Sequence, residues 1–158
     1  MKLFKKPNLL NVPIVFCAVV NAAVSMLHIS NTFFPGMIKY FKFPNWMQNN
    51  SIQIIIYSLI MAIIFLVFAF YTWKVLDEDN RPPFLRSILL LIGAIYLIRG
   101  LLFFVEVIIK LRTASLHYNI PTFELIISAV ALVIGVFYFE STISNWKSLV
   151  KLNNKLPE

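Results

Sequence analysis

Residues 84–111 read FLRSILLLIGAIYLIRGLLFFVEVIIKL, and this stretch decides the fold class. The polar residues inside its apolar run are Tyr96, Arg99 and Glu106. The run is longer than the roughly 20 apolar residues that a helix needs to cross a bilayer. The stretch therefore predicts a transmembrane helix that carries two charged side chains within the membrane.

Arg99 lies near the middle of this run, where a cation costs roughly 2.5–3.5 kcal/mol on the insertion scale. Glu106 follows seven residues later, close to two helical turns, so both side chains lie on one face, about 10 Å apart along the axis. Ionisable residues inside membranes pair with one another or mark a functional site. The sequence leaves both interpretations of Arg99 open.

Composition restricts the class of protein. Hydrophobic residues make up 59% of the chain and charged residues 13%, against about 25% charged in soluble domains. The mean hydropathy is +0.80. The net charge of +7 does not indicate nucleic acid, because the basic residues flank apolar runs instead of forming one patch. The single cysteine, Cys17, excludes a disulfide within the chain.

Three further apolar runs complete the architecture. We expect helices at about 8–28, 51–73, 84–111 and 121–141, in a single transmembrane domain over residues 1–158. With short connections these form an all-α integral membrane four-helix bundle of up-down-up-down topology. Residues 30–50 carry turn signals and alternate aromatic with basic side chains, so they predict a short interfacial segment between the first two helices.

The basic residues also predict the orientation. One side of the membrane holds nine, namely Lys2, Lys5, Lys6, Lys74, Arg81, Arg86, Lys147, Lys151 and Lys155. The other side holds four, namely Lys39, Lys42, Lys110 and Arg112. The side richer in Lys and Arg faces the cytoplasm, so both termini are expected there, in an inner (plasma) membrane.

With this topology, the internal polar residues of every predicted helix fall in the outward half of the membrane. This asymmetry predicts an outward-facing polar pocket around Arg99, in which Arg99 contacts an anion while Glu106 and Glu124 set its charge state. The candidate ligand-binding residues are Arg99, Glu106, Glu124, Asn21, Ser25, His28, Tyr96, Tyr57 and Ser128. Each also has a structural interpretation: Asn21 and Ser25, for example, suit hydrogen bonds between helices.

The side chains give little support for catalysis or for a cofactor. His28 with Glu106 and Glu124 is a plausible set of metal ligands, but no metal-binding motif accompanies them. The chain has no phosphate-binding loop, nucleophile elbow or H-E-x-x-H sequence. We therefore expect no cofactor or catalytic residue, and an enzyme acting on lipids is the least favoured function.

The run AIYLIRGLLFF, residues 94–104, follows a charged loop that contains Pro82-Pro83. In this it resembles small uncharacterised four-helix bacterial inner-membrane proteins. The resemblance covers the third predicted helix and extends toward the second. It implies a bacterial inner-membrane location and supports Arg99-Gly100 as a family feature, and it brings no activity with it.

Two functions from different classes remain. The first is a protein that binds or transports a small anionic or amphiphilic ligand. The second is an interaction protein, an accessory subunit or an immunity protein, whose buried charges are structural. In both cases the lipid bilayer is an expected partner, together with either a small-molecule ligand or a protein. Both functions are compatible with an oligomer. Neither involves nucleic acid. In both cases we expect the Arg99 guanidinium to contact Glu106, Glu124, Asn21 or Tyr96, with Glu124 favoured as the direct partner.

Overall fold

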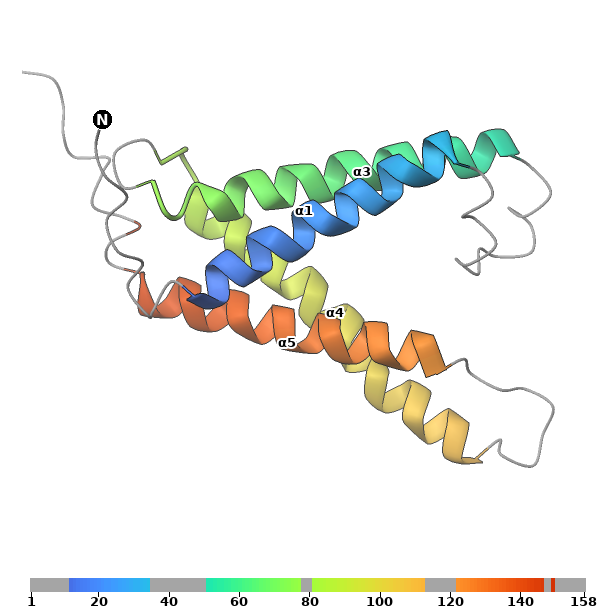
Figure 1. Ribbon diagram of the computed structural model, residues 1–158. Helices are drawn as coiled ribbons and strands as arrows, with labels where there is room; N and C mark the ends of the chain where they lie inside the picture. The colour runs from blue at the N-terminus through green and yellow to red at the C-terminus, as the bar shows by residue number, and fades with distance from the viewer. Residues whose placement is uncertain (1–11, 35–50, 78–80, 113–121, 147–148, 150–158) are drawn as a thin grey trace, which may run out of the picture. The chain divides into compact units, whose positions relative to one another are not determined.

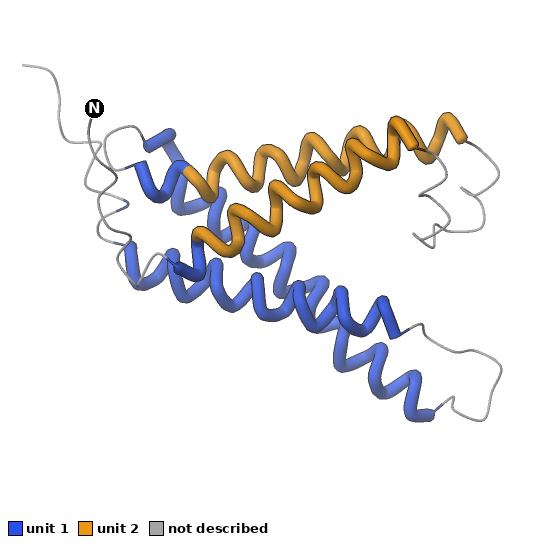
Figure 2. Tube along the Cα trace, in the orientation of Figure 1, with its two compact units in different colours: residues 1–14, 74–158 blue, residues 15–73 orange. Residues whose placement is uncertain are grey.

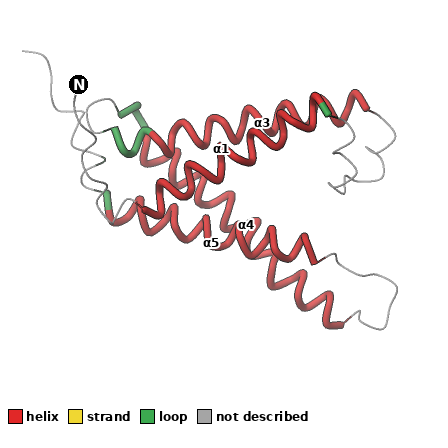
Figure 3. The backbone as a smooth tube through the Cα atoms, viewed as in Figure 1, coloured by secondary structure: helices red, strands yellow, loops and turns green. Residues whose placement is uncertain are grey.

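The computed structural model describes residues 12–34, 51–77, 81–112, 122–146 and 149 (Figure 1). Within these residues the chain forms four α-helices and no strand (Figure 3). They are α1 (Val12–Phe33), α3 (Ser51–Trp73), α4 (Leu85–Arg112) and α5 (Thr122–Ser144). All four are long and apolar enough to cross a membrane. The predicted all-α architecture of four membrane-spanning helices is confirmed, and the chain is a small multi-pass membrane protein.

Two helices extend beyond their predicted ends. α1 continues for five residues past His28, because the sequence up to Phe33 contains no helix breaker before Pro35. The hydroxyls of Ser30 and Thr32 donate back to the carbonyls of Met26 and His28, at 2.9 and 3.2 Å. α5 ends at Ser144 instead of about 141. The predicted interfacial segment is thereby shortened, and its residues 35–50 lie outside the described part of the chain.

The helices divide between two compact units, residues 15–73 and residues 1–14 with 74–158 (Figure 2). Unit 2 of Figure 2, residues 15–73, pairs α1 with α3, which run in opposite directions. Ser25 on α1 donates a hydrogen bond of 2.8 Å to the carbonyl of Ala62 on α3. The buried residues of α3 recur at helical spacing along one face, namely Ile54, Ser58, Ala62, Ala69 and Thr72.

Unit 1 of Figure 2 pairs α4 with α5, and glycines set how closely these helices approach. A Cβ at Gly100 would overlap the backbone of Leu132 on α5. A Cβ at Gly135 would lie 2.8 Å from the backbone nitrogen of Leu97 on α4. Small residues allow such backbone contact, and in lipid this packing, not the hydrophobic effect, drives helix association. The two glycines therefore fix the crossing of α4 and α5.

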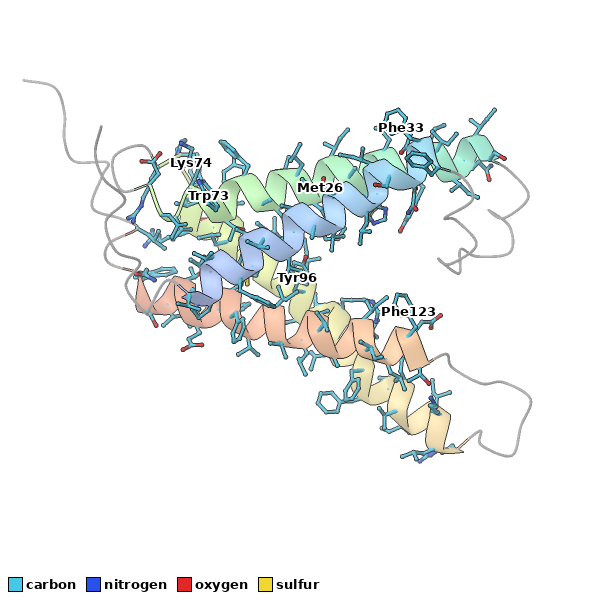
Figure 4. All side chains as sticks on the ribbon, in the orientation of Figure 1. Met26, Phe33, Trp73, Lys74, Tyr96 and Phe123 are labelled. Carbon is cyan, nitrogen blue, oxygen red and sulfur yellow. The ribbon has the colours of Figure 1, made fainter. Side chains whose placement is uncertain are left out.

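The outward faces of the helices are apolar. Large exposed side chains include Leu66 on α3 (57% exposed) and Ile98 on α4 (66% exposed). Such faces suit acyl chains, which are as apolar as these side chains. Trp73 and Lys74 lie side by side where α3 ends (Figure 4), as expected of an aromatic and a basic anchor at the membrane interface.

Candidate functional site

The polar site of the α4–α5 pair is built on Arg99. Its Nη1 donates to Glu106 Oε1 at 3.0 Å and to Ser128 Oγ on α5 at 2.6 Å. The Ser128 hydroxyl in turn donates to Glu106 Oε2 at 2.6 Å. One cation, one carboxylate and one hydroxyl thus form a closed triangle across two helices.

The Ser128 hydroxyl has a second acceptor within reach, the backbone carbonyl of Glu124 at 2.9 Å. A hydroxyl carries one hydrogen, so it cannot donate to both oxygens at once. The contact with the Glu106 carboxylate is shorter and charge-assisted, and hydrogen bonds of that kind are roughly twice as strong as neutral ones. Ser128 therefore serves mainly as the link between Arg99 and Glu106.

Helix geometry explains why these three side chains meet. Arg99 and Glu106 are seven residues apart, so they share a face of α4 and lean toward each other along it. Gly100, beside Arg99, allows the backbone of α5 to approach at Leu132, one turn from Ser128. A larger residue at position 100 would hold α5 away. The triangle therefore depends on close packing of the backbones as well as on the polar residues.

Arg99 uses only part of its hydrogen-bonding capacity. A guanidinium has five N–H donors, and both hydrogen bonds that Arg99 makes with the described residues come from Nη1, which carries two of these donors. Within the described residues, Nη2 and Nε donate no hydrogen bond. The Arg99 side chain is 38% exposed, against 16% for Glu106. One nitrogen of the guanidinium, Nη1, is thus held within the protein, and the side chain as a whole remains partly exposed.

The predicted contact of Arg99 is confirmed, because Glu106 is one of the partners expected for it. The preference for Glu124 as the direct partner was wrong. Arg99 reaches α5 at the level of Ser128, whereas Glu124 lies one turn further toward the start of α5 and contributes its backbone carbonyl to Ser128. Tyr96 packs its ring on that of Tyr138, with centroids 5.9 Å apart.

The remaining predicted site residues belong to the α1–α3 pair. Asn21 is buried and donates to the carbonyl of Cys17 on its own helix, at 2.8 Å. Ser25 bonds α1 to α3, the structural role weighed for it above. The His28 ring stacks on Phe65 at 5.9 Å and meets the edge of Tyr57 at 6.4 Å. The predicted set of nine residues is therefore found in two groups, one in each helix pair.

Two polar residues outside the predicted set of nine are buried in the same pair. Asn31 and Ser58 are 1% and 0% exposed. Among the described residues, no hydrogen-bond partner is found for either polar atom of the Asn31 amide, for Ser58 Oγ or for His28 Nδ1. Asn31 follows His28 by three residues and so shares its face of the helix. The spacing of His28 and Asn31 could have predicted this, but the helix was predicted to end at residue 28, before Asn31.

The part of the chain that the structure describes contains no group of three His, Cys, Asp or Glu side chains able to hold a metal ion. Comparison of the chain with protein-family models, with curated proteins and with solved structures finds no match. Function must therefore be inferred from the side chains themselves.

Proposed function

We propose that this multi-pass membrane protein binds a small amphiphilic molecule through the partly exposed side chain of Arg99. The proposal rests on one observation, that only one of the three guanidinium nitrogens of Arg99 donates hydrogen bonds to the described residues. Nη1 is held by Glu106 and Ser128, while Nη2 and Nε have no acceptor among the described residues and the side chain is 38% exposed. Donors that face hydrocarbon without an acceptor are costly, so a ligand oxygen stabilises them.

The charge of the site favours one class of ligand. Glu106 compensates the charge of Arg99, so the pair is close to neutral and attracts a free anion less than an isolated cation does. Donor geometry then dominates, and a guanidinium edge suits two oxygens in one plane. An amphiphile whose carboxylate, phosphate ester or carbonyl group reaches membrane depth fits both the donors and the surrounding apolar side chains.

The location proposed with this function is a bacterial inner membrane, with both termini in the cytoplasm and the Arg99 site open toward the other side. The nine-to-four distribution of basic residues and the resemblance of residues 94–104 support it. A reporter domain fused after Glu158 is expected to be active only on the cytoplasmic side. Activity of that fusion on the opposite side contradicts the orientation.

The test identifies the small molecules that remain bound to the protein during purification. Wild type and the variants Arg99→Leu, Arg99→Lys and Arg112→Leu are purified in a mild detergent, and co-purifying small molecules are measured by mass spectrometry. We expect a molecule that wild type retains and Arg99→Leu loses at least tenfold. Arg99→Lys should lose it in part, because an ammonium lacks the planar fork. Arg112→Leu, at the end of the same helix, should retain it.

An identical set of molecules in wild type and Arg99→Leu, with both proteins folded, contradicts the proposal. The second candidate function is then favoured, a membrane interaction protein whose charges are structural. The closed triangle of Arg99, Glu106 and Ser128 supports this candidate. It predicts that the double variant Arg99→Leu with Glu106→Gln keeps both stability and partner binding, because an ion pair replaced by neutral groups is often energetically neutral.

A further inference from the structure

Another arginine of the α4–α5 unit, Arg86, lies in the first turn of α4, whereas Arg99 lies near the middle of that helix. The first turn of α4 meets the end of α5, since the two helices run in opposite directions (Figure 1). There the guanidinium of Arg86 lies over the indole ring of Trp146, with Cζ 4.2 Å from the ring centroid. This is a cation–π contact, in which the ring quadrupole attracts the cation above the ring face.

Local hydrogen bonds hold Trp146 in place just past the end of α5. Both the backbone N–H and the side-chain amide of Asn145 donate to the carbonyl of Ser141, at 3.2 and 2.9 Å. The backbone N–H of Trp146 donates to Ile143 at 3.1 Å, which tightens the last turn. Trp146 remains 42% exposed. Its indole is therefore positioned by the backbone and still accessible from outside.

The neighbouring basic residues have oxygen acceptors in the part of the chain that the structure describes, whereas Arg86 has none there. Lys74 pairs with Asp77 at 2.9 Å, and Arg81 Nη2 donates to the carbonyl of Val75 at 3.0 Å. Among the described residues, no carboxylate or carbonyl accepts a hydrogen bond from Arg86. The contact with Trp146 supplies no oxygen acceptor, so the N–H groups of the guanidinium can bind the oxygens of a ligand.

An exposed aromatic side chain lies two residues before Arg86. Phe84 is 78% exposed and has φ of 60°, a left-handed conformation that non-glycine residues rarely adopt. Its carbonyl accepts the first bond of α4, from Ile88 N–H at 3.0 Å, so this conformation sits at the start of the helix. An apolar ring held outward at the end of a membrane span contacts acyl chains or the glycerol region.

We infer that Arg86 and Trp146 form a binding site for the phosphate group of an anionic phospholipid, with Phe84 contacting its apolar part. The guanidinium edge presents paired N–H donors that match two phosphate oxygens. Tryptophan at the end of a membrane span lies at headgroup depth, which is where the lipid phosphate also lies. A lipid supplies the phosphate and the apolar contact together, whereas free phosphate supplies only the first. This site is separate from Arg99 and does not depend on its function.

Trp146 itself provides the probe. In a background with Trp46→Phe and Trp73→Phe, Trp146 is the single tryptophan of the chain. The full-length protein is reconstituted in vesicles of phosphatidylcholine mixed with brominated phosphatidylglycerol, or with brominated phosphatidylcholine, and fluorescence quenching gives the relative affinity of each lipid. One basic residue near the surface predicts a preference of about fivefold for the anionic lipid at Trp146.

Arg86→Gln is expected to reduce this preference to about one, and Arg86→Lys to leave part of it. Arg112→Gln is the matched control, because it removes one positive charge at the other end of α4 and should leave the preference unchanged. Quenching by brominated phosphatidylcholine checks in every variant that Trp146 still lies at the interface. The inference is overturned if Arg86→Gln keeps the preference or Arg112→Gln loses it. It is also overturned if millimolar inorganic phosphate, at constant ionic strength, abolishes the preference, because the site then takes soluble phosphate.

Discussion

The two helix pairs satisfy their buried polar groups in different ways. In the α4–α5 pair, charged and hydroxyl side chains bond one another across the helices, as Arg99, Glu106 and Ser128 do. In the α1–α3 pair, neutral side chains bond backbone carbonyls, as Asn21 and Ser25 do. A neutral amide or hydroxyl can use a carbonyl of a helix, whereas a cation in a membrane needs a counter-charge as well.

Both pairs leave buried polar atoms without a hydrogen-bond partner among the described residues, on His28, Asn31 and Ser58 of α1 and α3 and on Ser141 and Thr142 of α5. The α4–α5 pair differs in one respect, its partly exposed cation. The unused donors of Arg99 belong to a side chain that is 38% exposed. Buried orphan atoms cost stability, whereas exposed donors can still be met by a ligand. We therefore propose recognition on α4–α5, where the unused donors are accessible, and four substitutions test how the two pairs are held together.

Gly100→Leu should have the largest effect. A Cβ alone would overlap the backbone of Leu132, so a leucine must separate α4 from α5 and break the Arg99–Ser128 contact. We expect a loss of more than about 3 kcal/mol in the free energy of unfolding, measured by denaturant titration in detergent. The matched control is Val105→Leu, at a position 50% exposed on the same helix, which should change little. Wild-type stability of Gly100→Leu contradicts the close crossing.

Glu106→Gln should have the next largest effect, because it removes the counter-charge of Arg99 and keeps the size of the side chain. Breaking a buried ion pair costs about 3–5 kcal/mol, and the 38% exposure of Arg99 lowers the expected loss to roughly 1–3 kcal/mol. Adding Arg99→Leu should recover most of this loss. Glu124→Gln is the control, because Glu124 contacts Ser128 through its backbone carbonyl and not through its carboxylate. This substitution should therefore change stability little. Equal losses in Glu106→Gln and Glu124→Gln would contradict the assignment.

Substitution of two serines of the α1–α3 pair by alanine should have the smallest effects on the free energy of unfolding. One substitution should lower it, and the other should leave it unchanged or raise it. Ser25→Ala removes a hydrogen bond between helices and should cost about 0.6 kcal/mol. Ser58→Ala removes a buried hydroxyl that has no partner, so stability should be unchanged or higher by up to about 1 kcal/mol. Both changes delete one oxygen from a buried serine on facing helices, so each controls the other. A loss in Ser58→Ala as large as in Ser25→Ala would mean that the Ser58 hydroxyl is satisfied in the membrane.

The sequence by itself determined the helices and the identity of the central charge. Long apolar runs fixed four membrane spans, because no other structure satisfies the backbone in hydrocarbon. The spacing of Arg99 and Glu106 placed both on one face, and the structure pairs them. The end of α1 was missed, because residues 30–50 were assigned to the connection on their turn signals. The hydroxyls of Ser30 and Thr32 instead bond back to the helix.

Only the tertiary structure decided which partner Arg99 takes on the neighbouring helix. Periodicity gives the face of a helix but not its longitudinal position against the next, and a shift of one turn exchanges Glu124 for Ser128. Contacts of Gly100 with Leu132 and of Gly135 with Leu97 set that position. The Arg86–Trp146 contact depends on the same packing, since it joins the first turn of α4 to the residues just past α5. Backbone contact at the glycines is a property of the pair of helices, and neither helix encodes it alone.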